Sequence, residues 1–339
     1  MNTKLVLDRL NEYTETELFF KRLYEVRQAC GGDIEKALRN FELSNHEKRL
    51  LDHPRVIDED VLFRHAGTGN VNISKHPRYV TDFLHCHNMF EMFYVVSGTC
   101  THTLNEKRSV LPANTFVIMA PEVDHRIGVF DDSIVLNIRI RRSTFQDYLV
   151  HIMNGGGSLS RFFVNCLYGK KQIVGMQTTL KDDELTNFLL QILHEQNFSD
   201  SYTNGILNSM LGVLFNKLER HCDMEGCEYI VTGSVNDSCL SMLLHMIENL
   251  NSITLKSLAD HFGYTVAHCS RMIKENTGMN FIDILRDIRL RQAESLLRST
   301  TFSVESISDA VGYHNSASFI KVFTQKYGMS PGVYRRSQV

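Results

Sequence analysis

The spacing of apolar residues changes along the chain and predicts four regions. Over residues 1–60 apolar residues recur at helical spacing. Over residues 61–142 short runs rich in valine, isoleucine, phenylalanine, tyrosine and threonine are cut by glycine and proline, a pattern typical of a β sandwich or barrel. Residues 143–235 are predicted to form a helical dimerisation or linker region, and residues 238–339 an all-α domain. The two helical stripes expected in the third region are Leu185, Leu189 and Ile192, then Ile206, Met210, Val213 and Leu214. We therefore predict an α+β multidomain fold.

The last region contains an internal repeat. The segment LADHFGYTVAHCSRMIKENTGMN begins at Leu258, and ISDAVGYHNSASFIKVFTQKYGMS begins at Ile307. Each copy predicts a helix, a tight turn at Gly263 or Gly312, and a second helix, because glycine adopts positive φ without strain. The intervening segment NFIDILRDIRLRQAESLLRS predicts one connecting helix of about 20 residues, or roughly 30 Å. Because adjacent major grooves on one face of B-DNA are about 34 Å apart, this helix can present two recognition helices to one DNA face.

The second helix of each repeat is expected to expose a face of small and polar side chains with one or two cations. A helix that enters the major groove requires such a face. In the first copy this face is Ala267, His268, Ser270, Arg271 and Lys274. In the second copy it is Asn315, Ser316, Ala317, Ser318 and Lys321.

Composition and charge support a DNA-binding C-terminal domain. The chain is 43% hydrophobic and 22% charged, with a net charge of −3, as in ordinary globular proteins. From Asn251 onward, however, it has 11 lysines and arginines against 7 aspartates and glutamates, so the basic charge lies in the repeat region. We expect no membrane segment and no signal peptide. Eight scattered cysteines are then best interpreted as reduced thiols in a cytoplasmic protein.

The C-terminal region from about Ser238 to Arg336 resembles the DNA-binding domain of the AraC/XylS family. The resemblance is carried by the two repeats, by RLRQAESLLRST between them, and by the closing run Pro331–Arg335. It implies base contacts from Ala267, Ser270 and Arg271 in the first unit and from Ser316, Ala317, Ser318 and Lys321 in the second. The family often has arginine where this chain has Lys321. Since lysine lacks the planar fork that grips guanine, the second unit is expected to contribute more to phosphate affinity.

The predicted β domain contains a second group of candidate site residues, His85, His87, Glu91 and His125. His85 and His87 point to one face of a strand, and Glu91 has the same parity. Three histidines and one glutamate provide nitrogen and oxygen ligands suited to iron, manganese, nickel or zinc.

This segment resembles a cupin barrel, with the pattern H-x-H-x3-E-x6-G followed by P-x3-H. It departs from that pattern at Leu111–Asn114, where cupins often have Pro-Gly-Asp. In AraC-type regulators such barrels commonly bind effectors, often without a metal. The residues therefore predict an organic effector pocket, a divalent transition metal site, or a hydrogen-bonded polar core.

The sequence thus predicts a dimeric transcription regulator that binds promoter DNA and responds to a small-molecule effector, with RNA polymerase as a further partner. It is not expected to be an enzyme. The alternative is a metal-dependent cupin enzyme or metal sensor fused to a DNA-binding domain.

Overall fold

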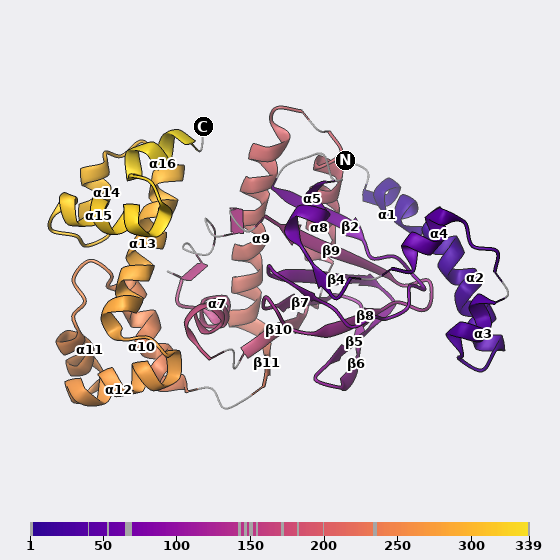
Figure 1. Ribbon diagram of the computed structural model, residues 1–339, viewed down its shortest axis with the longest axis horizontal. Coiled ribbons are helices and arrows are strands. Elements are labelled where there is room, and N and C mark those ends of the chain that lie inside the picture. Colours follow the sequence, from indigo (N-terminus) through magenta and orange to yellow (C-terminus); the bar gives the residue numbers. More distant parts are fainter. Residues whose placement is uncertain are drawn as a thin grey trace. The chain divides into compact units, whose positions relative to one another are not determined.

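The computed structural model (Figure 1) describes residues 3–337 except residues 40, 53, 65–69, 142–143, 146–147, 149–151, 154, 171–172, 182, 199 and 233–235. The chain folds into two compact units. One comprises Met1–Thr144 and Gly175–Ile230, and the other comprises Phe145–Val174 and Val231–Val339. Strands fall in the first unit and the wholly helical C-terminal region in the second, so the α+β fold class is confirmed. The domain boundaries expected at residues 142 and 235 lie outside the described residues.

The N-terminal segment is helical, as predicted. Its elements are α1 (Thr3–Asn11), α2 (Glu15–Ala29), α3 (Ile34–Leu38), α4 (Asn45–Leu50), the short strand β1 (Val56–Ile57) and α5 (Glu59–Arg64). Helix α2 begins at a capping box in which the Thr14 and Glu17 side chains accept each other's backbone N–H. Phe19, Phe20 and Leu23 form the apolar core of this segment.

A buried ion pair joins this segment to the β domain. Glu17 is fully buried, and its carboxylate accepts hydrogen bonds from Arg78 at 2.9 Å and Lys75 at 2.7 Å. Burial raises the pKa of Glu17, but these two cations outweigh burial and lower the pKa to about 2. The Arg78 guanidinium also lies 3.8 Å from the Tyr13 ring centroid. The N-terminal segment is therefore an integral part of the first unit.

The β domain consists of two main sheets. The strands are β2 (Val71–Lys75), β3 (Cys86–His87), β4 (Glu91–Ser97), β5 (Thr99–Leu104), β6 (Lys107–Pro112), β7 (Thr115–Met119), β8 (His125–Gly128) and β9 (Ile134–Ile140), with β10 (Ile173–Thr179) and β11 (Glu228–Val231). One sheet has the order β11-β10-β7-β4-β9-β2 and the other the order β6-β5-β8, while β3 pairs with β1. The side on which these sheets face each other is called the barrel interior below.

Helices α8 (Glu184–Glu195) and α9 (Thr203–Glu225) pack against the outer face of the larger sheet (Figure 1). The Tyr94 hydroxyl on β4 bonds to Thr186 of α8 at 2.7 Å, which fixes this face as the outer one. The third region of the sequence is not all helical, because β10 and β11 extend the sheet. Strand β10 pairs with β7 from Gly175 to Thr179.

The second unit is built around helix α13 (Phe281–Ser299), the connecting helix that the repeat predicts. Its other helices are α7 (Ser158–Tyr168), α10 (Asp237–Glu248), α11 (Leu255–Phe262), α12 (Val266–Thr277), α14 (Val304–Ala310), α15 (Ser316–Tyr327) and α16 (Pro331–Ser337). Asp287 of α13 accepts hydrogen bonds from Tyr168 of α7, Arg291 of α13 and Lys326 of α15. These bonds hold α7 and the second repeat on one helix. Among the described residues, no helix is both long and apolar enough to cross a membrane.

Candidate DNA-binding surface and buried histidine cluster

The first repeat forms a helix-turn-helix from α11 and α12. Gly263 ends α11 with φ 68°, the left-handed conformation expected of it. The Thr265 side chain then accepts the backbone N–H of His268 and so caps α12. Cys269 and Ile273 are fully buried and fix the inner face of α12.

The second repeat has the same local structure in α14 and α15. Gly312 makes the turn with φ 86°, and Asn315 caps α15 by accepting the backbone N–H groups of Ala317 and Ser318. Phe319 and Phe323 are fully buried under α15. The predicted contact residue Asn315 thus also has a structural role, because its carbonyl oxygen holds the helix start.

Hydrogen bonds from α15 and α16 hold the second repeat against α13. Glu294 of α13 accepts hydrogen bonds from the hydroxyls of Tyr327 and Tyr334, and Arg298 donates to the Tyr334 hydroxyl. Burial and the neighbouring Glu294 raise the pKa of Tyr334 to about 12, so its hydroxyl stays protonated and donates. The closing run of the sequence, in which Tyr334 lies, is therefore an anchor for the second helix-turn-helix.

The predicted contact residues lie on the outer faces of α12 and α15. Ala267, Arg271, Lys274, Asn315, Ala317, Ser318 and Lys321 are exposed, while His268, Ser270 and Ser316 are half-buried. His268 packs against the Tyr264 ring at 4.9 Å between centroids, which partly withdraws it from the surface.

Arg271 on α12 and Lys321 on α15 differ from three arginines of α13 in having no ion-pair partner among the described residues. On α13, Arg286, Arg291 and Arg298 pair with carboxylates of the same helix. In the described part of the chain, Arg271 and Lys321 take part in no ion pair. Side chains without an ion-pair partner remain available for phosphates and base edges.

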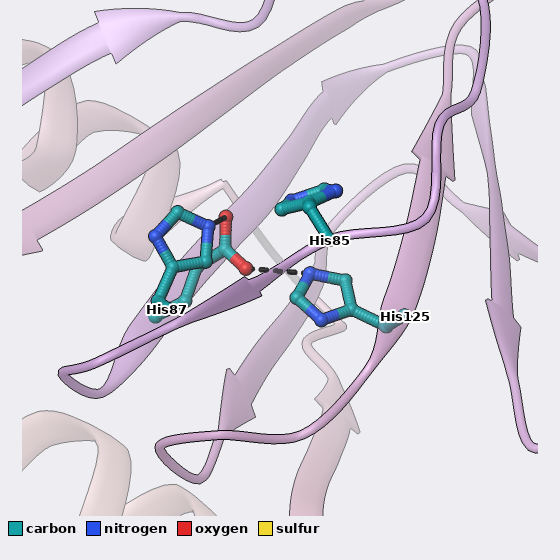
Figure 2. Close-up of side chains that lie close together, drawn as sticks. His85, His87 and His125 are labelled. Atoms are coloured by element: carbon teal, nitrogen blue, oxygen red, sulfur yellow. Dashed lines mark ion pairs between the residues drawn. The ribbon is translucent and has the colours of Figure 1, made fainter. Parts of the chain in front are cut away.

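The structure brings His85, His87, Glu91 and His125 together in the barrel interior. All four are buried, and one possible ligand atom from each lies within 4.8 Å of the others. His85 and His125 form a bridge between chain segments, with backbone hydrogen bonds of 2.9 and 3.0 Å. Figure 2 shows the three histidine rings arranged around one centre, with ion-pair contacts drawn from His87 and His125. These contacts to Glu91 are 3.1 Å from His87 Nε2 and 2.7 Å from His125 Nε2.

The histidines are oriented by backbone carbonyls behind them. His85 Nδ1 lies 3.1 Å from Phe83 O, and His125 Nδ1 lies 3.0 Å from Val123 O. In the neutral form that binds a metal, a proton on each Nδ1 would be donated to the carbonyl behind it and Nε2 would be free as a ligand, an arrangement common for metal-ligating histidines. Despite the short distances, His87 Nε2, His125 Nε2 and Glu91 Oε2 form no hydrogen bond with a partner among the described residues.

Glu91 is the anionic centre of this cluster. Burial raises its pKa, but the neighbouring His125 and His87 outweigh burial, and the pKa of Glu91 lies well below its ordinary value. Burial lowers the pKa of His125, and the charge of Glu91 reverses this, so the pKa of His125 is raised. Burial lowers the pKa of His85 to about 4, so His85 is neutral near pH 7. The cluster therefore combines a carboxylate with at least one neutral imidazole, a donor set that suits a divalent transition metal.

Four further polar residues of the barrel interior were not singled out from the sequence: His76, His102, Asn137 and Arg139. His102 is buried on β5, 5.6 Å from His125 between ring centroids, and burial lowers its pKa to about 4. The sequences of β5 and β9 contain a pattern that could have identified the polar residues on these strands. In IVLNIRI the polar residues Asn137 and Arg139 are two positions apart, the period of one strand face, and in TCTHTL His102 alternates with the threonines on the face of Cys100 and Leu104.

Comparison with known families identifies both units. Residues 73–207 match the family described as AraC-like ligand binding domain, and residues 258–337 match the family described as helix-turn-helix domain. Together these matches span more than half of the chain. The chain belongs to the AraC family of transcriptional regulators.

Relatives of this AraC-family chain cover most of its length. An uncharacterized HTH-type transcriptional regulator of Bacillus subtilis, YfiF, is 24% identical over 74% of this chain and 78% of its own. The HTH-type transcriptional activator RhaR of Salmonella choleraesuis is 24% identical over 76% of this chain and 89% of its own. A structure of ToxT from Vibrio cholerae with bound unsaturated fatty acid is 16% identical over 78% of this chain and 94% of its own, with a TM-score of 0.31. At that TM-score the likeness indicates nothing about the ligand of this chain.

The predicted family is thus confirmed, and the chain is a DNA-binding transcriptional regulator with an N-terminal ligand-binding domain. Proteins of the AraC family regulate transcription and are not enzymes. The alternative of a cupin enzyme fused to a DNA-binding domain is therefore dropped.

The two turn glycines of this AraC-family domain should differ in their tolerance of alanine. A Cβ at Gly312 would lie 2.7 Å from Arg289 Nη2 and 2.9 Å from the Asn251 backbone, whereas a Cβ at Gly263 meets nothing within 4 Å. Gly263→Ala should cost about 1–2 kcal/mol of unfolding free energy, the penalty for a left-handed alanine. Gly312→Ala should cost more, because the clash adds to that penalty. Equal losses for the two variants in urea unfolding followed by circular dichroism would contradict the close approach at Gly312.

Proposed function

We propose that α12 and α15 are the two recognition helices and that both bind promoter DNA through their exposed faces. The observation that carries this proposal is that Arg271 and Lys321 lie on those faces among small side chains and form no ion pair with any described residue. The contact set proposed is the one predicted from the sequence: Ala267, His268, Ser270, Arg271, Lys274, Asn315, Ser316, Ala317, Ser318 and Lys321. The proposal includes action in the cytoplasm and contact with RNA polymerase, which follow from promoter binding rather than from a feature of the fold.

Substitutions at Arg271 and Lys321 should have different consequences. Arg271→Ala should weaken specific binding by about 1–3 kcal/mol and relax preference at one base pair, since arginine reads a base edge with two hydrogen bonds. Lys321→Ala should weaken binding to all sequences alike and reduce the salt slope by about 1. Arg286→Ala, which removes an arginine paired with Asp283 on α13, is the matched control and should change neither. Binding titrations on the operator at several salt concentrations measure all three. Wild-type affinity and preference in Arg271→Ala would refute this assignment.

We also propose that the chain forms a dimer through the exposed face of α9. Of the stripes expected to dimerise, Leu185, Leu189, Ile192 and Leu214 are buried within the first unit and are not available. Ile206 and Val213, seven residues apart, remain 43% and 44% exposed, and Tyr202 is 74% exposed one turn earlier. Intervals of four and seven residues correspond to about one and two helical turns. The three side chains therefore form one apolar stripe that a second copy of α9 can cover. A dimer would place four recognition helices on one promoter and raise the effective concentration of each pair.

Ile206→Asp should therefore produce folded monomers that bind the operator more weakly, because an aspartate cannot be desolvated in an apolar interface. Asn204→Asp introduces the same charge at an exposed position of α9 outside the stripe and should leave the dimer intact. Sedimentation at tens of micromolar compares the variants with the unmodified chain. A monomeric unmodified chain would rule out the dimer.

For the ligand-binding domain, we propose that His85, His87, Glu91 and His125 hold a divalent transition metal ion at which the effector is recognised. The supporting observation is that three of their nitrogen and oxygen atoms are buried and have no hydrogen-bond partner among the described residues, although they make ion-pair contacts at 2.7–3.1 Å. Tetrahedral ligands about 2.0–2.2 Å from one ion lie about 3.3–3.6 Å from one another. The four candidate atoms lie within 4.8 Å of one another, so they are close enough to bind one ion after moving toward it. A bound ion would act as a Lewis acid toward oxygen or nitrogen atoms of an effector.

Full-length protein purified without added metal should contain about one transition metal ion per chain by elemental analysis. His87→Ala should lose most of this metal, because removal of one of four ligands weakens binding. His46→Ala removes an exposed histidine of α4 and should retain the metal. If the cluster is only a packed polar core, His87→Ala should lower the melting temperature with no change in metal content. Basal operator affinity should be similar in both variants, because the contact residues lie in the other unit.

A further inference from the structure

The barrel interior contains an arginine beside the proposed metal cluster. In the register of β4 and β9, Met92 pairs with Ile138, so Glu91 and Arg139 are the next residues across the two strands. Side chains opposite each other in neighbouring strands lie on the same face of the sheet. The Arg139 side chain therefore lies on the Glu91 side, which is the side that faces the histidines.

The hydrogen-bond partners of Arg139 in the described part of the chain are neutral groups. Its Nη1 donates to Ser74 Oγ at 2.9 Å and to Asn72 Oδ1 at 3.4 Å, both on β2. Its Nε is shielded from solvent and has no hydrogen-bond partner among the described residues. Burial lowers the pKa of Arg139, and the charge of Glu91 opposes this, so the arginine remains a cation.

Two further polar atoms in the same interior also have no hydrogen-bond partner among the described residues. Asn137, two residues before Arg139 on β9, donates its amide to His76 Nδ1 at 3.2 Å, while its Oδ1 is buried without a partner. His102 Nε2 on β5 is likewise buried without a partner. Buried polar groups without a partner are rare, because each costs about 1–3 kcal/mol. Three such atoms on β5 and β9, from His102, Asn137 and Arg139, indicate a polar ligand in this interior.

The charges of the surrounding groups indicate the sign of the charge on that ligand. A divalent ion, the Arg139 guanidinium and the Glu91 carboxylate sum to two positive charges in a buried interior. Uncompensated charge in such surroundings is costly and attracts a counter-ion. Without the metal, Glu91 and Arg139 alone would balance, and an anion would not be required.

We propose that the effector is a small organic carboxylate, with one carboxylate group hydrogen-bonded to Arg139 and a further oxygen coordinated to the metal at His85, His87, Glu91 and His125. The assignment rests on the metal site proposed above. Asn137 and His102 act as polar partners for the rest of the ligand. The planar guanidinium suits a carboxylate because the two form paired N–H···O hydrogen bonds.

The test uses the full-length protein loaded with Co²⁺, whose visible absorption reports changes in coordination. Oxalate, a dicarboxylate that chelates metals, is the anionic probe, and imidazole is a neutral ligand for the same ion. In Arg139→Gln the dissociation constant for oxalate should rise at least about tenfold, the loss expected for a charge-assisted hydrogen bond, while that for imidazole should not change. Arg139→Lys keeps the charge but loses the planar fork, and its oxalate affinity should fall between the two. Cobalt content and melting temperature, measured on each variant, show that the site is still folded.

Three results would overturn the proposal, and they differ in what they imply for the metal site. Equal oxalate affinity in wild type and Arg139→Gln, with cobalt bound in both, would exclude the arginine as the carboxylate partner and leave the metal site standing. A wild-type protein that binds no cobalt would overturn the metal site and the carboxylate assignment together. Parallel loss of oxalate and imidazole binding in Arg139→Gln at full cobalt content would show that Arg139 maintains the metal site rather than the ligand.

Discussion

The ligand-binding unit is organised around an ionised carboxylate that is kept away from water. Glu91 is 5% exposed, and an isolated carboxylate in such surroundings would normally take up a proton. It remains charged because His87 and His125 reach it from β3 and β8, so three strands must hold their positions together. The direct bridge between His85 and His125 supplies this constraint, since it ties the segment before β3 to the other sheet. The polar interior therefore depends on long-range pairing of strands rather than on any local motif.

The DNA-binding unit is subject to a different constraint, because both helix-turn-helix motifs pack on one helix. Helix α13 does so with acidic side chains on its buried side, each matched by donors from the helices packed on it. Asp287 binds α7 and α15, and Glu294 binds tyrosines of α15 and α16. On the other side of α13, Arg289 donates to the Leu250 carbonyl at the end of α10, which connects the first repeat to the same helix. Cations used for these internal bonds are not available to DNA, whereas Arg271, Lys274 and Lys321 take part in no ion pair among the described residues.

Local pattern and repetition predicted much of this architecture. The two repeats, their turn glycines and the length of α13 follow from residue spacing, because helices and tight turns are determined over a few residues. The convergence of His85 and His87 followed from strand alternation alone. Strands β10 and β11 could not be predicted in this way, because each is stabilised by partners distant in sequence, as in the pairing of β10 with β7. The burial of Glu17 against Arg78 likewise joins residues 61 positions apart. Arg139 could be predicted only in part. The alternation of polar and apolar residues in its strand is visible in the sequence, but its position opposite Glu91 depends on the register of β4 and β9.

The connectivity of the two units bears on how a ligand could influence DNA binding. The chain passes from one unit to the other three times, after residues 144, 174 and 230. The segment Phe145–Val174 thus belongs to the DNA-binding unit, yet it connects two strands of the ligand-binding sheet, β9 and β10. Within its own unit, α7 of this segment is bonded to α10 through Arg161 and Asp237 and to α13 through Tyr168 and Asp287. An effector changes DNA affinity only if it binds one arrangement of the protein more tightly than another. Strand β9 carries Arg139 and leads into the segment that contains α7. A shift in the position of β9 on ligand binding would therefore reach α7 along the chain, and α13 through the hydrogen bond from Tyr168 to Asp287. This route does not depend on any surface contact between the units.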